Sequence, residues 1–146
     1  MDKTIHLFLF PVAGQDVAAT EEMLKEQEIP QNEDETFEDA VVRHFGGEGR
    51  WECVTLKGQW TGKQDMEAKA AIRVWRQDIR QFVADELQYP AEVVSRAVET
   101  WTFPNCPVTK DGYLALPVGV GEVLYIEVMR RLYPTLSDHP SFRGAK

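Results

Sequence analysis

The side chains best suited to catalysis, histidine and cysteine, are few and scattered. Three histidines and two cysteines occur among 146 residues, and none forms the HExxH or CxxC spacing that holds zinc or a redox pair. Cys53 and His44 could meet in space as a nucleophile and a base, but their spacing gives no support for it. A reactive thiol needs an accessible, electropositive surrounding, whereas Cys53 falls inside an expected strand, WECVTL. We therefore assign no catalytic residue, no metal ligand and no cofactor.

A glycine-rich stretch, FGGEGRW at residues 45–51, raises the question of phosphate binding. Glycine loops cradle phosphate when they follow a strand and open a helix. Here an expected helix precedes the glycines and an expected strand follows them, and neither GxxxxGK[ST] nor GxGxxG is present. We interpret the stretch as the end of a helix followed by a loop.

Four basic residues recur at helical spacing and could bind an anion. They are Lys69, Arg73, Arg76 and Arg80. On the helix expected there they occupy the face opposite an apolar stripe, where they could contact phosphates. They could equally form ion pairs with Asp65, with Asp78 or with the acidic segment around residues 16–40. Nucleic-acid binders generally carry net positive charge, whereas this chain carries −8, so direct nucleic-acid binding is disfavoured.

Negative charge is concentrated in one part of the chain. Residues 16–40 contain ten acids and one base, a net charge of −9, and the remaining fourteen acids and fifteen bases carry +1. A concentrated excess of charge produces a local field that steers cationic partners. The densest stretch is NEDETFED, residues 32–39, whose carboxylates belong to Glu33, Asp34, Glu35, Glu38 and Asp39.

Two interpretations of this acidic stretch remain open. Acids in the first turn of a helix interact favourably with its dipole, and a helix capped by Asn32 would explain Glu33, Asp34 and Glu35 in this way. Glu38 and Asp39 would lie beyond that turn. The stretch is then either a solvated helix face, as charge runs usually are, or a surface that docks on a basic partner and imitates the phosphates of a nucleic acid.

Aromatic residues offer a second candidate surface. Trp75 is expected in the core because it continues a helical apolar stripe. Trp101 and Phe103 lie where an expected helix enters the proline-rich loop TFPNCPVTKDG. If exposed, they would form a partner-binding patch, since tryptophan is enriched at binding hot spots. The alternative is a core anchor at the base of the loop.

The elements that must position these residues are short strands and helices in irregular alternation. Strands are expected at residues 4–10 and 113–118, and a hairpin at residues 50–62 with Lys57 and Gly58 in its turn. Helices are expected at residues 17–27, 33–45, 65–87, 91–101 and 121–133, the last with a strand at 122–128 as its alternative.

This pattern predicts an α+β fold, in which a small, largely antiparallel sheet of about three to five short strands packs against three to five helices. The length predicts a single globular domain, residues 1–146. The chain lacks an apolar run of the roughly 18 residues that a membrane span needs. Its N-terminus also lacks the basic start and long apolar stretch of a signal peptide. We therefore expect a cytoplasmic protein with no membrane partner.

Two functions of different kinds fit these observations. The first is a small acidic interaction protein, a non-catalytic inhibitor that docks its carboxylates on a basic or nucleic-acid-handling protein, as immunity proteins, antitoxins and phage or plasmid anti-defence proteins do. The second is a small enzyme or ligand-binding domain, with a pocket near the FGGEGRW turn or the TFPNCPV loop. We favour the first, because no catalytic constellation stands out.

Overall fold

The computed structural model describes residues 3–133, which form an α+β fold, as predicted. The strands are β1 (Thr4–Val12), β2 (Gln15–Thr20), β3 (Arg50–Leu56), β4 (Arg73–Arg76), β5 (Gln81–Ala84) and β6 (Val98–Trp101). Four of them make one antiparallel sheet in the order β2-β1-β3-β6, and β4 pairs with β5 in a separate hairpin. The predicted antiparallel sheet is therefore confirmed.

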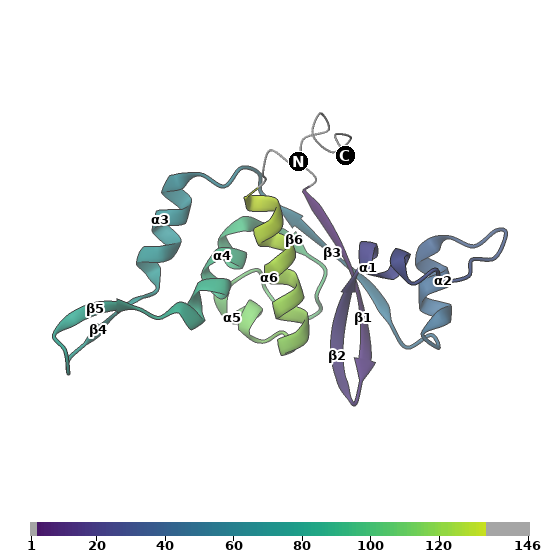
Figure 1. Ribbon diagram of the computed structural model, residues 1–146, viewed down its shortest axis with the longest axis horizontal. Coiled ribbons are helices and arrows are strands. Elements are labelled where there is room, and N and C mark those ends of the chain that lie inside the picture. Colours follow the sequence, from purple (N-terminus) through teal and green to yellow (C-terminus); the bar gives the residue numbers. More distant parts are fainter. Residues whose placement is uncertain (1–2, 134–146) are drawn as a thin grey trace.

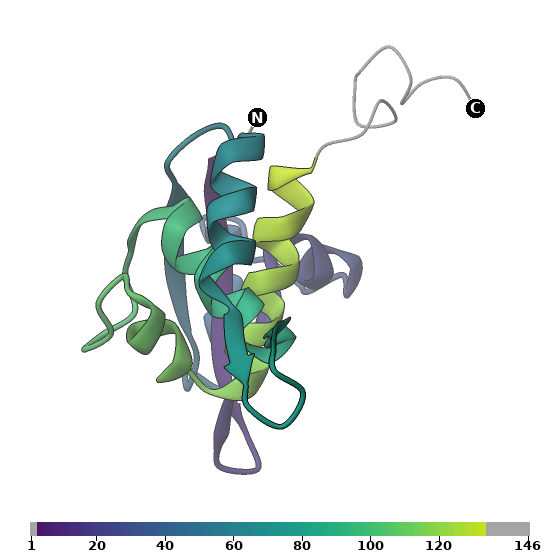
Figure 2. The same cartoon turned by 90° about the vertical axis from the view of Figure 1, so that its left-hand side faces the viewer.

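Helices cover both faces of the four-stranded sheet. They are α1 (Glu21–Glu26), α2 (Phe37–His44), α3 (Gly62–Ala71), α4 (Tyr89–Ala97), α5 (Lys110–Leu114) and α6 (Val118–Leu132), with a 3-10 turn η1 (Glu86–Gln88) before α4. Figure 1 shows α1 and α2 on one side of the sheet and α4, α5 and α6 on the other. The helix α3 continues into the β4-β5 hairpin, which projects at one end of the molecule in Figure 1 and faces the viewer in Figure 2.

Successive side chains of β1 point to opposite faces of the sheet, and each face carries its own hydrophobic core. Ile5, Leu7 and Leu9 face α4 and α6 and belong to the larger core. Phe8 points to the opposite face, as alternate strand residues do, and forms a smaller core with Leu24 of α1 and with α2. Each group of helices is thus fixed to the sheet by its own set of strand side chains.

The first predicted helix, residues 17–27, is wrong in its first half. Residues 15–20 instead form β2, because Ala13 and Gly14 both have positive φ, 53° and 83°, and close a two-residue hairpin between Val12 and Gln15. Turns of this kind match the twist of paired strands. The helix begins after Thr20, whose hydroxyl accepts a hydrogen bond from the Met23 backbone N–H at 3.1 Å.

The predicted hairpin at residues 50–62 is confirmed only in its first strand, β3. This strand pairs with β1 and β6 and not with the residues that follow it. Trp60 precedes α3, which starts with a capping box at Thr61: its hydroxyl accepts from the Gln64 backbone N–H, and its own N–H donates to Gln64 Oε1. This reciprocal pairing satisfies two donors that a helix start leaves open, so the chain enters a helix at Gly62 without forming the predicted second strand.

The long predicted helix, residues 65–87, divides into α3 and the β4-β5 hairpin. Val74 pairs with Val83 and Trp75 with Phe82 across the two strands. β-branched and aromatic residues pack well in such cross-strand pairs, and their spacing also matched a helical stripe. As a result Trp75, predicted in the core, is 50% exposed.

The predictions for residues 91–133 are confirmed only in part. The predicted helix at 121–133 is confirmed as α6, and helix 91–101 is confirmed in part, since α4 ends at Ala97 and β6 follows. The strand predicted at 113–118 is wrong, because Thr109 caps the short helix α5 by accepting from the Gly112 backbone N–H at 3.0 Å.

Candidate functional site

Negative charge gathers at one end of the molecule. Residues 21–48, which contain α1, α2 and their loops, hold ten acids and two bases, a formal charge of −8. We call this segment the acidic lobe. In Figure 1 it lies on the opposite side of the sheet from the β4-β5 hairpin, which projects from the other end of the molecule.

The smaller core fixes the acidic lobe to the sheet. Phe8 is fully buried, with its ring centroid 5.4 Å from those of Phe45 and Trp51. Val41 of α2 is fully buried against the same cluster. The indole N–H of Trp51 donates to the Glu38 backbone carbonyl at 3.0 Å. These contacts hold the apolar side of α2 against the sheet, so the polar side of the helix faces solvent.

Glu35 differs from the other acids in the NEDETFED stretch, because it is bound within the lobe. The Arg43 guanidinium donates to both of its carboxylate oxygens, with Nη2 at 2.9 Å from Oε1 and Nε at 3.0 Å from Oε2. Glu35 Oε1 also accepts the Asn32 backbone N–H at 3.2 Å. The hydrogen bonds from Arg43 and then Asn32 lower the pKa of Glu35 below its usual value. Glu35 therefore shapes the loop before α2.

The remaining four carboxylates of the stretch are free of internal ion pairs. Glu33, Asp34, Glu38 and Asp39 are exposed, and within residues 3–133 none of them lies within salt-bridge distance of a basic side chain. The helix α2 starts after Thr36 and not after Asn32. The first turn of α2 therefore contains Glu38 and Asp39, whose charges interact favourably with the helix dipole. The sequence had predicted this interaction for Glu33 and Asp34 instead, and these two residues lie outside the helix.

The four predicted anion-binding residues do not share a helix face. Lys69 lies on α3 and pairs with Asp65 at 2.7 Å, while Arg76 pairs with Asp78 at 2.6 Å. Arg73 and Arg76 belong to strand β4, three residues apart and hence on opposite faces. Arg80 lies in the hairpin turn with a φ of 50°. The alternative interpretation, internal pairing with Asp65 and Asp78, is therefore confirmed for Lys69 and Arg76.

Trp101 and Phe103 lie in and beside the larger core. Phe103 is 5% exposed and Trp101 is half-buried, with ring centroids 5.4 Å apart. The Trp101 indole N–H donates to the Cys106 backbone carbonyl at 2.6 Å. The pair thus anchors the base of the proline-rich loop, which was the alternative to an exposed partner-binding patch.

Cys53 meets a histidine, but not the one considered from the sequence. Its Sγ lies 3.3 Å from His6 Nδ1, because Cys53 and His6 face each other across β3 and β1. His44 lies instead against Phe45. Burial and then the neighbouring Glu52 carboxylate raise the pKa of the Cys53 thiol, and the reactive form of a cysteine is the thiolate. This pair therefore lacks the environment of an activated nucleophile.

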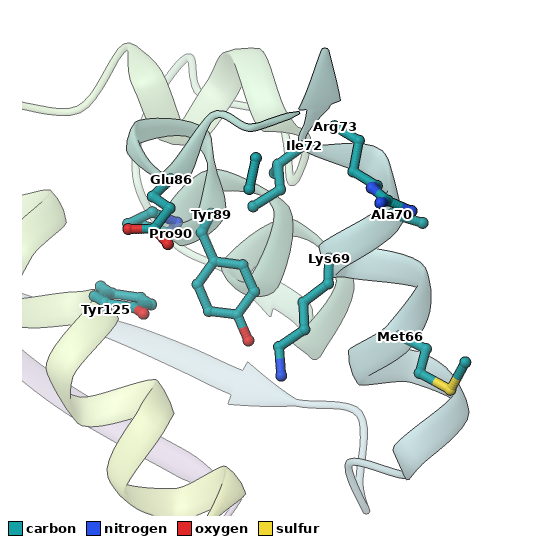
Figure 3. A pocket seen from close by; sticks show the side chains of 10 residues that line it. Met66, Lys69, Ala70, Ile72, Arg73, Glu86, Tyr89, Pro90 and Tyr125 are labelled. Carbon is teal, nitrogen blue, oxygen red and sulfur yellow. The ribbon is translucent and has the colours of Figure 1, made fainter. Parts of the chain in front are cut away.

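The structure also forms a groove that the sequence did not predict. It has a volume of about 760 Å³ and lies between α3, the hairpin, α4 and α6, as Figure 3 shows. Its lining residues are Met66, Lys69, Ala70, Ile72, Arg73, Ala84, Glu86, Tyr89, Pro90 and Tyr125. Neither the FGGEGRW turn nor the TFPNCPV loop, where a pocket was predicted, contributes to it. The run of apolar residues after α3 was visible in the sequence but was assigned to a helix.

A hydrogen-bonded carboxylate stiffens the wall of this groove. Asp65 Oδ1 accepts from the Tyr133 hydroxyl at 2.6 Å, the Tyr89 hydroxyl at 2.8 Å and the Trp60 indole at 3.3 Å. Lys69 binds its other oxygen. Chiefly the bond from Lys69, then that from Tyr133, holds the pKa of Asp65 well below its usual range, while burial and Asp65 raise the pKa of Tyr89. Because their pKa values are shifted away from neutrality, Asp65 and Tyr89 are poorly suited to acid–base catalysis near pH 7.

Replacing Asp65 by alanine is expected to lower the free energy of unfolding by about 2 kcal/mol at pH 7, because four donors lose a charged acceptor. Since folding depresses the pKa of Asp65, its contribution is complete above its ordinary pKa of about 3.9 and declines as the pH falls below that value. Urea unfolding at pH 7 and pH 3 measures this, with Glu67→Ala on the same helix as the control. An equal loss at both pH values would contradict the assignment.

The structure thus defines an α+β protein with helices on both faces of a four-stranded antiparallel sheet. No protein-family model, curated protein or solved structure matches the chain. Among residues 3–133, no group of three or more histidine, cysteine, aspartate or glutamate side chains could hold a metal ion. Within the same part of the chain, no helix combines the length and apolar composition that a membrane crossing requires.

Proposed function

We propose that this chain is a non-catalytic interaction protein that docks its acidic lobe on a basic partner, most simply a nucleic-acid-handling protein of the same cytoplasm, and inhibits it. The observation that carries the proposal is the set of four exposed carboxylates, Glu33, Asp34, Glu38 and Asp39, without internal ion pairs in the described chain. Like charges held close together repel one another, and the dipole of α2 favours only Glu38 and Asp39 among the four.

The mechanism is electrostatic steering followed by contact. Concentrated surface charge raises the association rate of an oppositely charged partner, and this effect weakens as salt screens it. The lobe is suited to the task because its own small core holds the carboxylates on a fixed framework. A preorganised charged surface avoids the ordering cost that a flexible acidic tail would incur on binding.

The test is a charge reversal that leaves the lobe folded. The variant Glu33→Lys, Asp34→Lys, Glu38→Lys and Asp39→Lys reverses the four unpaired carboxylates and retains the Glu35–Arg43 pair. Affinity capture from host lysate at low and high salt identifies the partner, and its dissociation constant is then measured with both proteins. The variant is expected to bind at least about 10-fold more weakly, because charges at the rim of an interface act mainly by raising the association rate.

A matched control separates a local effect from net charge. Glu67→Lys, Glu99→Lys, Asp111→Lys and Glu122→Lys reverse four exposed acids outside the lobe and change the total charge equally. This control is expected to bind like the wild type. If the two variants bind alike, or if no basic protein is captured at low salt, the acidic lobe is a solvated face and the proposal fails.

A further inference from the structure

The β4-β5 hairpin is an arm that the rest of the described chain leaves uncovered. Its apolar side chains include Trp75, Ile79 and Phe82, which are 50%, 46% and 59% exposed. Figure 1 shows it extending from α3 away from the sheet. A two-stranded hairpin alone is at best marginally stable in water, and exposed apolar patches mark interaction surfaces. The arm therefore needs a covering partner.

The exposed aromatic pair and the groove lie on the same side of this arm. Trp75 pairs with Phe82, and Arg73 pairs with Ala84 two residues farther along each strand. Residues two apart on a strand point to the same face, and Arg73 and Ala84 line the groove. A projecting aromatic pair, with rings 5.1 Å apart, thus stands beside a hollow with apolar walls.

We propose that the occupant of this surface is a second copy of the chain, in a two-fold dimer in which each arm covers the groove of the other. In a two-fold contact the same patch meets itself, so a projection and a hollow side by side can fill each other reciprocally. Trp75 and Phe82 of one copy then cover the Met66 and Ile72 region of the other. Both apolar surfaces are buried by one symmetric interface.

The distribution of charge favours a second copy over a charged partner. Residues 72–86 hold three arginines and three acids and are neutral, so the arm attracts neither a basic nor an acidic surface strongly. The acidic lobe carries the charge and lies away from the arm (Figure 1). Two copies of a chain with net charge −8 can meet through their arms while their acidic lobes remain apart.

The two ends of the arm carry complementary charges without a described partner. Arg80 lies in the turn and Glu86 at the base next to α4, both exposed, and neither forms an ion pair within residues 3–133. When two arms meet in opposite directions, the turn of one lies beside the base of the other. The dimer is therefore expected to pair Arg80 of each copy with Glu86 of its partner.

The test is the oligomeric state of the full chain, measured by sedimentation equilibrium over a range of concentrations. The wild type is expected to dimerise, and Trp75→Ala with Phe82→Ala to weaken the dimer at least about 10-fold, as loss of a buried aromatic anchor does. Leu114→Ala with Val118→Ala, at sites 58% and 76% exposed elsewhere, is the matched control and should dimerise normally.

A charge exchange then tests the geometry of the dimer. Arg80→Glu and Glu86→Arg are each expected to weaken it several-fold, and the combined variant to recover most of the affinity. A monomeric wild type at all concentrations would overturn the proposal, as would a dimer insensitive to the aromatic substitutions or a charge exchange that does not recover. Capture of a different protein by the arm of a monomeric chain would assign the surface to that partner instead. None of these outcomes affects the acidic lobe.

Discussion

Replacing Phe8 by alanine should lower the free energy of unfolding by about 3–5 kcal/mol, the range for removing a buried phenylalanine. Phe8 is fully buried and central to the smaller core, with ring contacts to Phe10, Phe45 and Trp51. Gly49 leaves room for this ring, since a Cβ there would lie 2.0 Å from Phe8 Cζ. The substitution thus removes the side chain on which α1 and α2 rest.

The same variant connects the smaller core to binding. If this core holds the carboxylates in place, Phe8→Ala should also weaken capture of a basic partner, although every carboxylate of the acidic lobe is retained. Urea unfolding and proteolysis within residues 21–48 measure the structural effect. Val12→Ala, on the same strand but 51% exposed, is the control and should unfold like the wild type. Equal stability of the two variants would show that the lobe does not depend on Phe8.

Elements with a single plausible structure were predictable from the sequence. The strand at the N-terminus and the helix at 121–133 are confirmed, and the helix predicted at 33–45 is confirmed from Phe37 to His44. In α2 the apolar residues recur every four positions and all contribute to one core. Local periodicity sufficed there because the buried face and the helical face coincide.

The region after Ala71 could not be predicted in the same way. Ile72, Trp75, Ile79 and Phe82 fit a helical stripe as well as a hairpin, because both arrangements place Trp75 and Phe82 on a shared side. The choice depends on cross-strand pairing of Val74 with Val83 and on a turn residue, Arg80, with positive φ. Neither is visible from apolar spacing alone, so the exposed arm and the groove beside it were both missed.

The location of the acidic residues was predictable from the sequence, but the ion pairs that they form were not. The sequence indicated where acidic residues gather, because charge density is read directly from the chain. It did not indicate that Arg43 binds Glu35 while Glu33 and Asp34 remain unpaired, since this depends on how the loop before α2 folds back. The groove is still less accessible, because its walls come from segments between residues 66 and 125 that meet only in the folded chain.

Replacing Gly112 by alanine is expected to destabilise the larger core severely, by about 3 kcal/mol or more, as overpacking of a rigid site does. A Cβ at this position would lie 1.8 Å from the Pro107 carbonyl oxygen, a backbone atom that no side-chain rotation can move. The Gly112 N–H also donates to the Thr109 hydroxyl that caps α5. The next residue, Tyr113, belongs to the larger core, so a shift of α5 would disturb that core.

The chain offers a matched glycine for comparison. Gly62 opens α3, and a Cβ there would meet no heavy atom within 4 Å. Gly62→Ala should therefore be neutral or stabilising by roughly 0.4–1 kcal/mol, because alanine restricts the unfolded chain without strain in the folded one. Urea unfolding of both variants measures the difference. A Gly112→Ala protein as stable as Gly62→Ala would mean that the loop before α5 yields to the added methyl group, and that α5 is not fixed to the larger core through Pro107.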